Sequence, residues 1–173
     1  MKHISLTQGK YARINDIDFT WLSQWKWYAQ KGGTTFYAVR WDNVKEGRRI
    51  KIQMHCVLLK RKLNRELHSD ERVDHRDLNG LNNQRKNLRL ANDTENNRNV
   101  GIRRDNTSGY KGVTWRYDNQ SWQTRIQVNK KRIHLGYFTN PREAALAYDV
   151  AALKYFGEFA VTNRSLGLLK GNE

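Results

Sequence analysis

An adjacent aspartate and histidine, Asp74 and His75, stand near the middle of the chain in the strand-like sequence RVDH. Successive side chains of a strand point to opposite faces. Asp74 can therefore offer a hard oxygen ligand to a metal ion on one side, while His75 handles protons on the other. This pair predicts a metal ligand beside a general base.

Asparagines are unusually frequent in the segment DLNGLNNQRKNLRLANDTENNRN that follows this pair. The loop DLNGLNNQRK leads to a second predicted strand, NLRLA, which would place Asn87 beside His75, where an amide can hold the orientation and tautomer of the imidazole. A short helix is predicted to begin at Asp93 or Thr94, so that Asn96 adds a second oxygen to the same cation. Asparagine clusters usually indicate turns, but few structural explanations need so many, and the ordered set favours a site.

The central segment, from about residue 55 to 99, resembles the HNH nucleases of the ββα-metal type, in particular the phage and intron-encoded homing endonucleases with the pattern VDHxxGxxxNNxxxNLRxxxxxENxxN. The resemblance implies that His75 is the general base and that Asn87 orients it. It implies that Asp74 and Asn96 bind one divalent cation. Asparagine at the last HNH position favours a hard ion, magnesium, for which manganese can substitute, and weakens the case for zinc.

The chemistry that this resemblance implies is hydrolysis of a DNA phosphodiester bond to 5′-phosphate and 3′-hydroxyl ends. His75, with an ordinary pKa of about 6.5, takes a proton from the attacking water, and the cation offsets the developing negative charge. His55 is a second candidate base, but we assign it a structural role because the Asp-His pair already supplies one. Arg76 and Arg89 either clamp phosphate or lie on a solvated face.

Three segments of strand length, YKGVTWRY, SWQTRIQV and KRIHLGYF, follow one another from Tyr110 and are separated by the turn sequences DNQ and NKK. They predict an antiparallel meander. Apolar and polar residues alternate along the second and third strands, which predicts one apolar face and one basic, polar face. The apolar set comprises Trp122, Thr124, Ile126, Val128, Ile133, Leu135 and Tyr137.

A helix is predicted directly after these strands, in TNPREAALAYDVAALKYFG. Asn140 is its predicted N-cap, Pro141 suits its first turn, Glu143 completes a capping box, and Gly157 ends it. Its alanines let it lie close against the apolar face of the sheet. The basic face is then left open.

Basic charge is concentrated in the predicted sheet. The whole chain has a formal net charge of +15, and residues 101–139 hold eight basic residues against two acidic ones, whereas residues 140–173 hold four of each. This contrast predicts that the helix faces away from a polyanionic partner. A sheet with such a face can enter the DNA major groove, where arginine reads guanine and glutamine reads adenine; a solvated face is the alternative.

Residues 108–163 resemble the plant ethylene-response-factor (AP-two type) DNA-binding domain, through the YKGV start, the LGYF third strand and the ALAYDVAA helix. The resemblance implies that the sheet lies in the major groove. The plant recognition sequence is not expected, because residues that are arginine or tryptophan in the family are replaced here. The groove-facing residues implied by position are Lys111, Thr114, Arg116, Arg125, Gln127, Arg132 and His134.

The fold class predicted from these patterns is α+β, a ββα-metal HNH module plus a three-stranded antiparallel sheet packed on one helix. A strand-rich segment with four tryptophans, residues 1–53, precedes the HNH module of residues 54–99; its tryptophans predict an aromatic core, with a stacking surface for bases as the alternative. Residues 100–109 form a linker, in which Arg103 and Arg104 contact phosphates or the minor groove. The DNA-binding domain spans residues 110–165.

The composition of the chain limits the cellular locations and bound metals that can be expected. Cys56 is the only cysteine, so no intrachain disulfide can form, and no CxxC pair suggests structural zinc. No apolar run approaches the length of a membrane span. We expect an intracellular protein that is not secreted, located in the cytoplasm of a bacterial or phage-infected host or at the nucleoid. Its expected partner is double-stranded DNA, and whether it is a monomer or a dimer stays open.

The function predicted from the sequence is that of a site-directed DNA endonuclease of the homing type. The rival interpretation is a non-catalytic, sequence-specific DNA-binding regulator with an HNH-like scaffold. Retention of Asp74, His75, Asn87 and Asn96 favours the enzyme. An RNA-binding protein is disfavoured because the major groove of A-form RNA is too narrow for a sheet.

Overall fold

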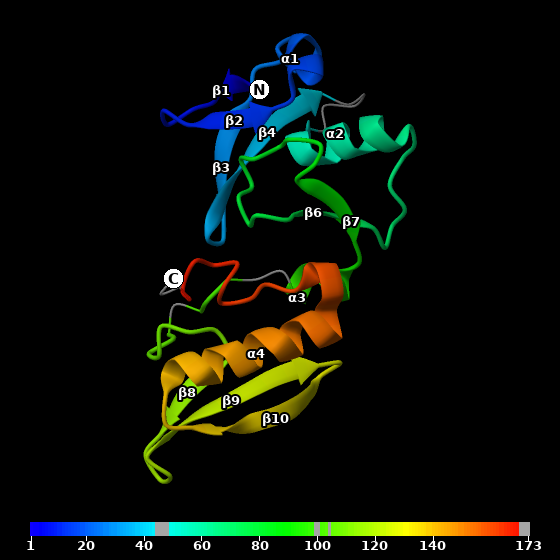
Figure 1. Cartoon of the computed structure of the whole chain (residues 1–173). Helices are drawn as coiled ribbons and strands as arrows, with labels where there is room; N and C mark the ends of the chain where they lie inside the picture. Colours follow the sequence, from blue (N-terminus) through cyan, green and yellow to red (C-terminus); the bar gives the residue numbers. More distant parts are fainter. Residues whose placement is uncertain (44–48, 99–100, 104, 170–173) are drawn as a thin grey trace. The chain divides into compact units, whose positions relative to one another are not determined.

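The computed structural model describes residues 1–43, 49–98, 101–103 and 105–169 (Figure 1). The chain divides into two compact units, Met1–Thr94 and Glu95–Glu173. Each is built from small antiparallel sheets and helices, so the architecture mixes α and β elements as predicted. None of the helices in the described ranges is long and apolar enough to cross a membrane.

The first unit contains three small antiparallel sheets, β1–β2, β3–β4–β5 and β6–β7, together with helices α1 and α2. Helix α3 (Asp93–Arg98) begins at the end of this unit. The bounds of the other elements are β1 (Lys2–Ser5), β2 (Tyr11–Ile14), α1 (Asp16–Leu22), β3 (Tyr28–Gly32), β4 (Thr35–Asn43), β5 (Arg49–Gln53), α2 (Met54–Leu63), β6 (Arg72–His75) and β7 (Leu88–Ala91).

One hydrophobic core runs through the whole first unit. Trp27 is 2% exposed and packs in the same cluster as Leu58 of α2 and Leu88 of β7. Trp21 and Trp25 border this cluster, in line with the predicted aromatic core, whereas Trp41 is 52% exposed. Residues 1–53 and 54–94 thus share one core, although the sequence interpretation placed a module boundary at residue 53.

The second unit contains the predicted three-stranded sheet and its helix (Figure 1). Strands β8 (Val113–Arg116), β9 (Ser121–Val128) and β10 (Lys131–Phe138) pair antiparallel in the order β8–β9–β10, and α4 (Pro141–Phe156) follows, with the short 3-10 helix η1 (Gly157–Phe159) after it. The predicted cap is also present, because the Asn140 side chain accepts a hydrogen bond from the amide of Arg142 at 2.8 Å.

Helix α4 covers the apolar face of this sheet. Ile126 of β9 is 2% exposed and clusters with Tyr148 and Ala152 of the helix. Thr124, fully buried on the same strand, donates a hydrogen bond through its hydroxyl to the carbonyl of Ala144 at 3.1 Å. The small side chains of the helix permit this close approach. The opposite face of the sheet is therefore the polar one.

A β-bulge in strand β10 changes which residues reach the polar face. His134 pairs with Arg125, but Gly136 then pairs with Thr124, so one residue is inserted between them. Gly136 adopts a φ of +141°, which L side chains rarely adopt. The prediction that Tyr137 belongs to the apolar face is wrong, because the bulge places Tyr137 opposite Gln123 on the polar face.

Asn163 joins the start of the sheet to helix α4 in the second unit. Its side chain is fully buried, accepts a hydrogen bond from the Lys111 amide at 2.6 Å, and donates to the carbonyls of Lys111 and Ala145. The carboxylate of Asp149 accepts from both the amide and the side chain of Asn163. Asn163 is thus the structural clamp of this unit.

We expect Asn163→Ala to destabilise the second unit by at least about 1 to 3 kcal/mol, because it leaves buried backbone groups without partners. The measurement is amide hydrogen exchange of β9 in the full chain under increasing urea. Asn119→Ala, an exposed asparagine in the β8–β9 turn, is the matched control. Equal protection of β9 in both variants would contradict the clamp role.

Candidate catalytic centre and candidate DNA-binding sheet

Asp74 lies in β6 directly opposite Arg89 in β7. The side chains are 5% and 7% exposed, and the Nε and Nη2 atoms of Arg89 each lie 2.7 Å from Oδ2 of Asp74. Both of these contacts fall on Oδ2. From the sequence, Arg89 was expected either to bind phosphate or to lie on a solvated face. The pairing of β6 with β7 instead brings its guanidinium against the Asp74 carboxylate.

His75 ends strand β6 and is 6% exposed. Its Nε2 lies 3.4 Å from Oδ1 of Asn83, whose Nδ2 donates to the carbonyl of Gly80 at 3.5 Å. With the oxygen of Asn83 facing the ring, His75 carries its proton on Nε2 and a lone pair on Nδ1. Burial lowers the pKa of His75 below 6.5 despite the opposing effect of Asn83 and two nearby carboxylates. The imidazole is therefore neutral at pH 7.

Asn83 owes its position to the N-terminal strand β2. Its amide donates to the carbonyl of Arg13 at 2.8 Å, and the amide of Arg13 donates in return to the carbonyl of Leu81. The Asn83 side chain itself is fully buried. Strand β2 thus helps to build the candidate catalytic centre, a contribution that no short-range pattern in the sequence could indicate.

Asn87 directly precedes Leu88, the residue that pairs with His75, and its carbonyl accepts from the amide of Arg76 at 3.0 Å. Its Nδ2 donates to Asp77 Oδ1 at 2.8 Å and to the carbonyl of Asn82, while its Oδ1 accepts from the Asp77 amide at 3.1 Å. Asn87 therefore closes the base of the loop between β6 and β7, and Asn83 is the residue whose side chain meets the His75 ring. The signal for Asn83 was the NN pair in the motif, which sequence reasoning did not assign.

The other asparagines of this loop also have structural partners. Asn82 donates to Asp77 at 2.6 Å, and Asn79 accepts from the amide of Leu81 at 3.0 Å. The expectation that few structural explanations need so many asparagines is thus wrong for this loop. A partly buried ion pair between Arg85 of this loop and the buried Asp18 of α1, with contacts of 2.6 and 2.8 Å, joins the loop to that helix.

We expect Asn83→Ala to reduce DNA cleavage roughly 10- to 100-fold, the usual effect of losing a residue that orients a reactive histidine or metal ligand. The cause would be a mobile ring whose tautomer is no longer fixed. Single-turnover cleavage of plasmid DNA measures this effect. Asn79→Asp, which preserves an oxygen acceptor for Leu81 on an exposed residue, serves as the control, and an unimpaired Asn83→Ala enzyme would contradict the role.

His55 and Tyr37 enclose His75. The ring centroid of His55 lies 5.0 Å from that of His75 at an interplanar angle of 77°, and Tyr37 lies 5.5 Å from His55 and 5.9 Å from His75. His55 is 5% exposed, and burial lowers its pKa to about 3. A ring that stays neutral and buried against His75 fits the structural role predicted for His55.

Asn96, the second predicted metal ligand, lies in helix α3 with an exposed side chain and belongs to the second unit, whereas Asp74 belongs to the first. Among the described residues, no three or more of His, Cys, Asp and Glu gather into a metal-binding group. The predicted donors, one carboxylate and one amide oxygen, are nevertheless the hard type that suits magnesium. The metal site stays a prediction.

The polar face of the second unit's sheet gathers the predicted DNA-binding residues. Cross-strand pairing places Gln127 opposite Arg132, Arg125 opposite His134, and Thr114 opposite Gln123. These positions alternate with the residues that α4 covers, so they share the opposite face. Six of the predicted residues lie on it by register: Thr114, Arg116, Arg125, Gln127, Arg132 and His134.

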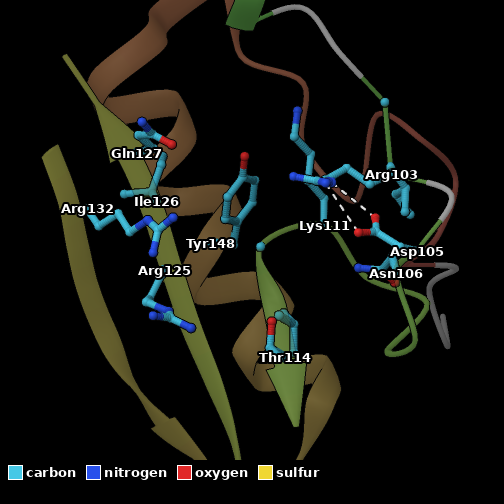
Figure 2. Close-up of a pocket in the computed structure, with 14 residues that line it drawn as sticks. Arg103, Asp105, Asn106, Lys111, Thr114, Arg125, Ile126, Gln127, Arg132 and Tyr148 are labelled. Atoms are coloured by element: carbon cyan, nitrogen blue, oxygen red, sulfur yellow. Dashed lines mark hydrogen bonds and ion pairs between the residues drawn. The ribbon is translucent and has the colours of Figure 1, made fainter. Parts of the chain in front are cut away.

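A hollow of about 590 Å³ opens where β8 begins beside β9 (Figure 2). Cationic side chains from separate segments line it, and Figure 2 shows Arg125 and Arg132 on the two adjacent strands. Burial lowers the pKa of Lys111 to about 8, so this amine is still largely protonated at pH 7. The lining includes Arg103, Asn106, Lys111, Thr114, Arg125, Gln127, Arg132 and Tyr148.

Two of the predicted arginines are already held by an aspartate two residues further along the chain. Arg116 contacts Asp118 at 3.1 and 2.8 Å, and Arg103 contacts Asp105 at 3.0 and 3.2 Å. These pairs are exposed, and exposed ion pairs contribute little, so DNA can replace the aspartates at low cost. Arg104 lies outside the described residues.

Comparison with known proteins finds two kinds of similarity. No protein-family model matches the chain. It is 29% identical over 157 residues to an uncharacterized HNH endonuclease of Acanthamoeba polyphaga mimivirus, a match that covers 91% of this chain and 76% of that protein. It is also 47% identical over 58 residues to the AP2-like ethylene-responsive transcription factors AIL5 and PLT2 of Arabidopsis thaliana.

The plant match covers 32% of this chain and only about a tenth of each plant protein. The chain is therefore similar along most of its length to a protein named an HNH endonuclease, and over about a third of its length to proteins named AP2-like transcription factors.

Proposed function

We propose that this protein is a homing-type DNA endonuclease that hydrolyses phosphodiester bonds with one divalent cation, leaving 5′-phosphate and 3′-hydroxyl ends. The observation that carries the proposal is the Asp74–His75 pair at the end of β6. Arg89 holds the carboxylate, and Asn83 fixes a neutral imidazole with its lone pair on Nδ1. Similarity to a protein named an HNH endonuclease supports it.

The protein groups contribute to hydrolysis through position and protonation state. Nδ1 of His75 accepts the proton of the attacking water, and the contact of Nε2 with Asn83 keeps that atom directed to the reaction. Asp74 and Asn96 would hold a magnesium ion, which when bound stabilises negative charge on the phosphate and the leaving oxygen. Arg89 restrains the Asp74 carboxylate through two contacts of 2.7 Å with Oδ2.

DNA recognition is assigned to the polar face of the β8–β9–β10 sheet. The face is basic and lies opposite the one that α4 covers, and the similarity to AP2-like transcription factors supports this assignment. Its side chains can reach base edges in the major groove, while turn residues meet the phosphates. Double-stranded DNA is the proposed partner.

Arg125 and Lys130 separate these two kinds of contact. Arg125 lies on the face, whereas Lys130 is exposed in the two-residue turn between β9 and β10, where its φ is +66°. We expect Arg125→Ala to reduce the discrimination between bases by about 1 to 3 kcal/mol of binding free energy at one base position. Lys130→Gly, which keeps the turn, should weaken binding to all DNA sequences alike. It should also reduce the steepness with which log affinity falls with log salt concentration by about one. Gel-shift titrations at several salt concentrations test both, and a uniform loss for Arg125→Ala would contradict its role.

Supercoiled plasmid DNA incubated with the protein, with and without magnesium, tests the proposed activity. We expect the protein to convert the plasmid to nicked or linear DNA only when magnesium is present. A rival function, that of a DNA-binding regulator, predicts retarded but uncut plasmid under both conditions. That outcome would overturn the endonuclease proposal and leave the sheet's role standing.

A further inference from the structure

Three side chains form a hydrogen-bonded cluster on the polar face that the strand alternation did not predict. Gln123 of β9 lies directly opposite Tyr137 of β10, and its Nε2 lies 3.0 Å from the Tyr137 hydroxyl and 3.4 Å from Nδ1 of His134. The rings of His134 and Tyr137 lie side by side, with centroids 4.7 Å apart. The Gly136 bulge creates this cluster, because it moves Tyr137 onto the face that holds His134.

The amide of Gln123 determines where the hydrogen atoms of its two partners lie. An amide nitrogen has two hydrogens and only donates. The Tyr137 oxygen therefore accepts from Gln123, so its own hydrogen is directed elsewhere. Nδ1 of His134 accepts as well in the tautomer that carries its hydrogen on Nε2. Gln123 is only 9% exposed, whereas Tyr137 is 49% exposed and His134 is exposed too.

We infer that His134 and Tyr137 form a preset pair of hydrogen-bond donors that selects guanine in the DNA major groove. This inference rests on the proposed function, since it requires the polar face of the sheet to lie against base edges. Guanine is the base that presents two adjacent acceptors there, N7 and O6. Adenine presents one acceptor beside a donor, thymine one acceptor beside a methyl group, and cytosine a donor. A rigid pair of donors therefore matches guanine and opposes the other three bases.

Gln123 is a positioning residue in this scheme, because it is buried and acts through its two neighbours. Its replacement by glutamate changes a donor into an acceptor of nearly the same shape. The hydrogens of Tyr137 and of His134 Nδ1 would then be drawn to the carboxylate. Tyr137 would then no longer present its hydrogen to a base, so the two-donor pattern would be lost although both side chains would still be present.

Selection of bound sequences from a random double-stranded DNA library tests the inference. The full-length protein is used in EDTA, so that bound DNA is not cut. The wild type is compared with Tyr137→Phe, with Gln123→Glu, and with Tyr155→Phe as the matched control, a hydroxyl loss on helix α4 at the other side of the sheet. The selected site is then synthesised with 7-deazaguanine, which lacks the N7 acceptor, at each guanine in turn.

The expected result is one guanine position whose preference falls roughly 5- to 150-fold in Tyr137→Phe and in Gln123→Glu, the range for one good base contact, while Tyr155→Phe keeps it. At that position 7-deazaguanine should weaken binding by the wild type, because one of the two donors then lacks its N7 acceptor. An enriched motif that both variants share unchanged with the wild type would overturn the donor pair but keep the sheet as the reader. No enriched motif for the wild type would overturn both the inference and the proposed recognition by the sheet.

Discussion

Replacement of His75 by alanine is expected to reduce DNA cleavage by roughly 10² to 10⁴-fold, the contribution of a positioned general base. DNA affinity should stay nearly unchanged, because the basic sheet of residues 101–139 belongs to the other unit of the chain. The physical reason is the neutral imidazole, whose proton is held on Nε2 by Asn83 and whose lone pair on Nδ1 can accept a proton from water. Single-turnover cleavage rates and gel-shift affinities measure the two effects separately.

The matched control for this experiment is His68→Ala, since His68 is an exposed histidine of the same unit. His75 packs against His55 and Tyr37, so its truncation opens space in the cluster. Circular dichroism of both variants shows whether the unit still folds. Equal cleavage by folded His75→Ala and by the wild type would remove His75 from the chemistry, and His55 would then be the next candidate base.

The parts of the fold that depend on neighbours in sequence were predictable. The cap at Asn140, the proline at the first turn of α4 and the turn after Val128 each depend on a few adjacent residues. The alternation along β9 likewise predicted which residues α4 would cover. The bulge at Gly136 was not predictable by that route, because alternation assumes an unbroken register and the bulge shifts it by one residue.

In the candidate catalytic centre, too, the residues with local sequence signals were predictable and those that depend on distant contacts were not. Asp74 and His75 are adjacent at the end of one strand, and both are buried. Arg89 and Asn83 were missed or misassigned because their roles depend on non-local contacts. Arg89 acquires its role from the pairing of β6 with β7, and Asn83 from the contact of its loop with β2. A motif read along the chain contains these residues but not their partners.

Removal of the divalent cation is expected to abolish cleavage without abolishing DNA binding. Excess EDTA should stop nicking of supercoiled DNA, and magnesium added back should restore it. DNA retention on a gel should persist, because the charges assigned to DNA contact lie mainly on the sheet and not at Asp74. Full activity in excess EDTA would contradict the proposed single-metal hydrolysis.

Substitution of the ligands locates the cation more sharply than chelation does. Asp74→Ala is a poor probe by itself, because it removes the carboxylate that pairs with the buried guanidinium of Arg89, and breaking a buried ion pair costs about 3 to 5 kcal/mol of stability. Asn96 is exposed, so Asn96→Ala should leave the fold intact. We expect it to raise the magnesium concentration for half-maximal cleavage by at least roughly 10- to 100-fold, the effect known for residues that merely support ligands.

Magnesium titrations of cleavage by Asn96→Ala and by Asn119→Ala, an exposed asparagine in the turn after β8, supply the comparison. If both variants need the same magnesium concentration as the wild type, Asn96 is no ligand, and the second oxygen must come from another residue. If the requirement rises in Asn96→Ala alone while DNA affinity is unchanged, Asn96 binds the cation that the reaction uses. Because the variant changes neither the Asp74–Arg89 pair nor His75, such a shift reports on metal affinity and not on the base.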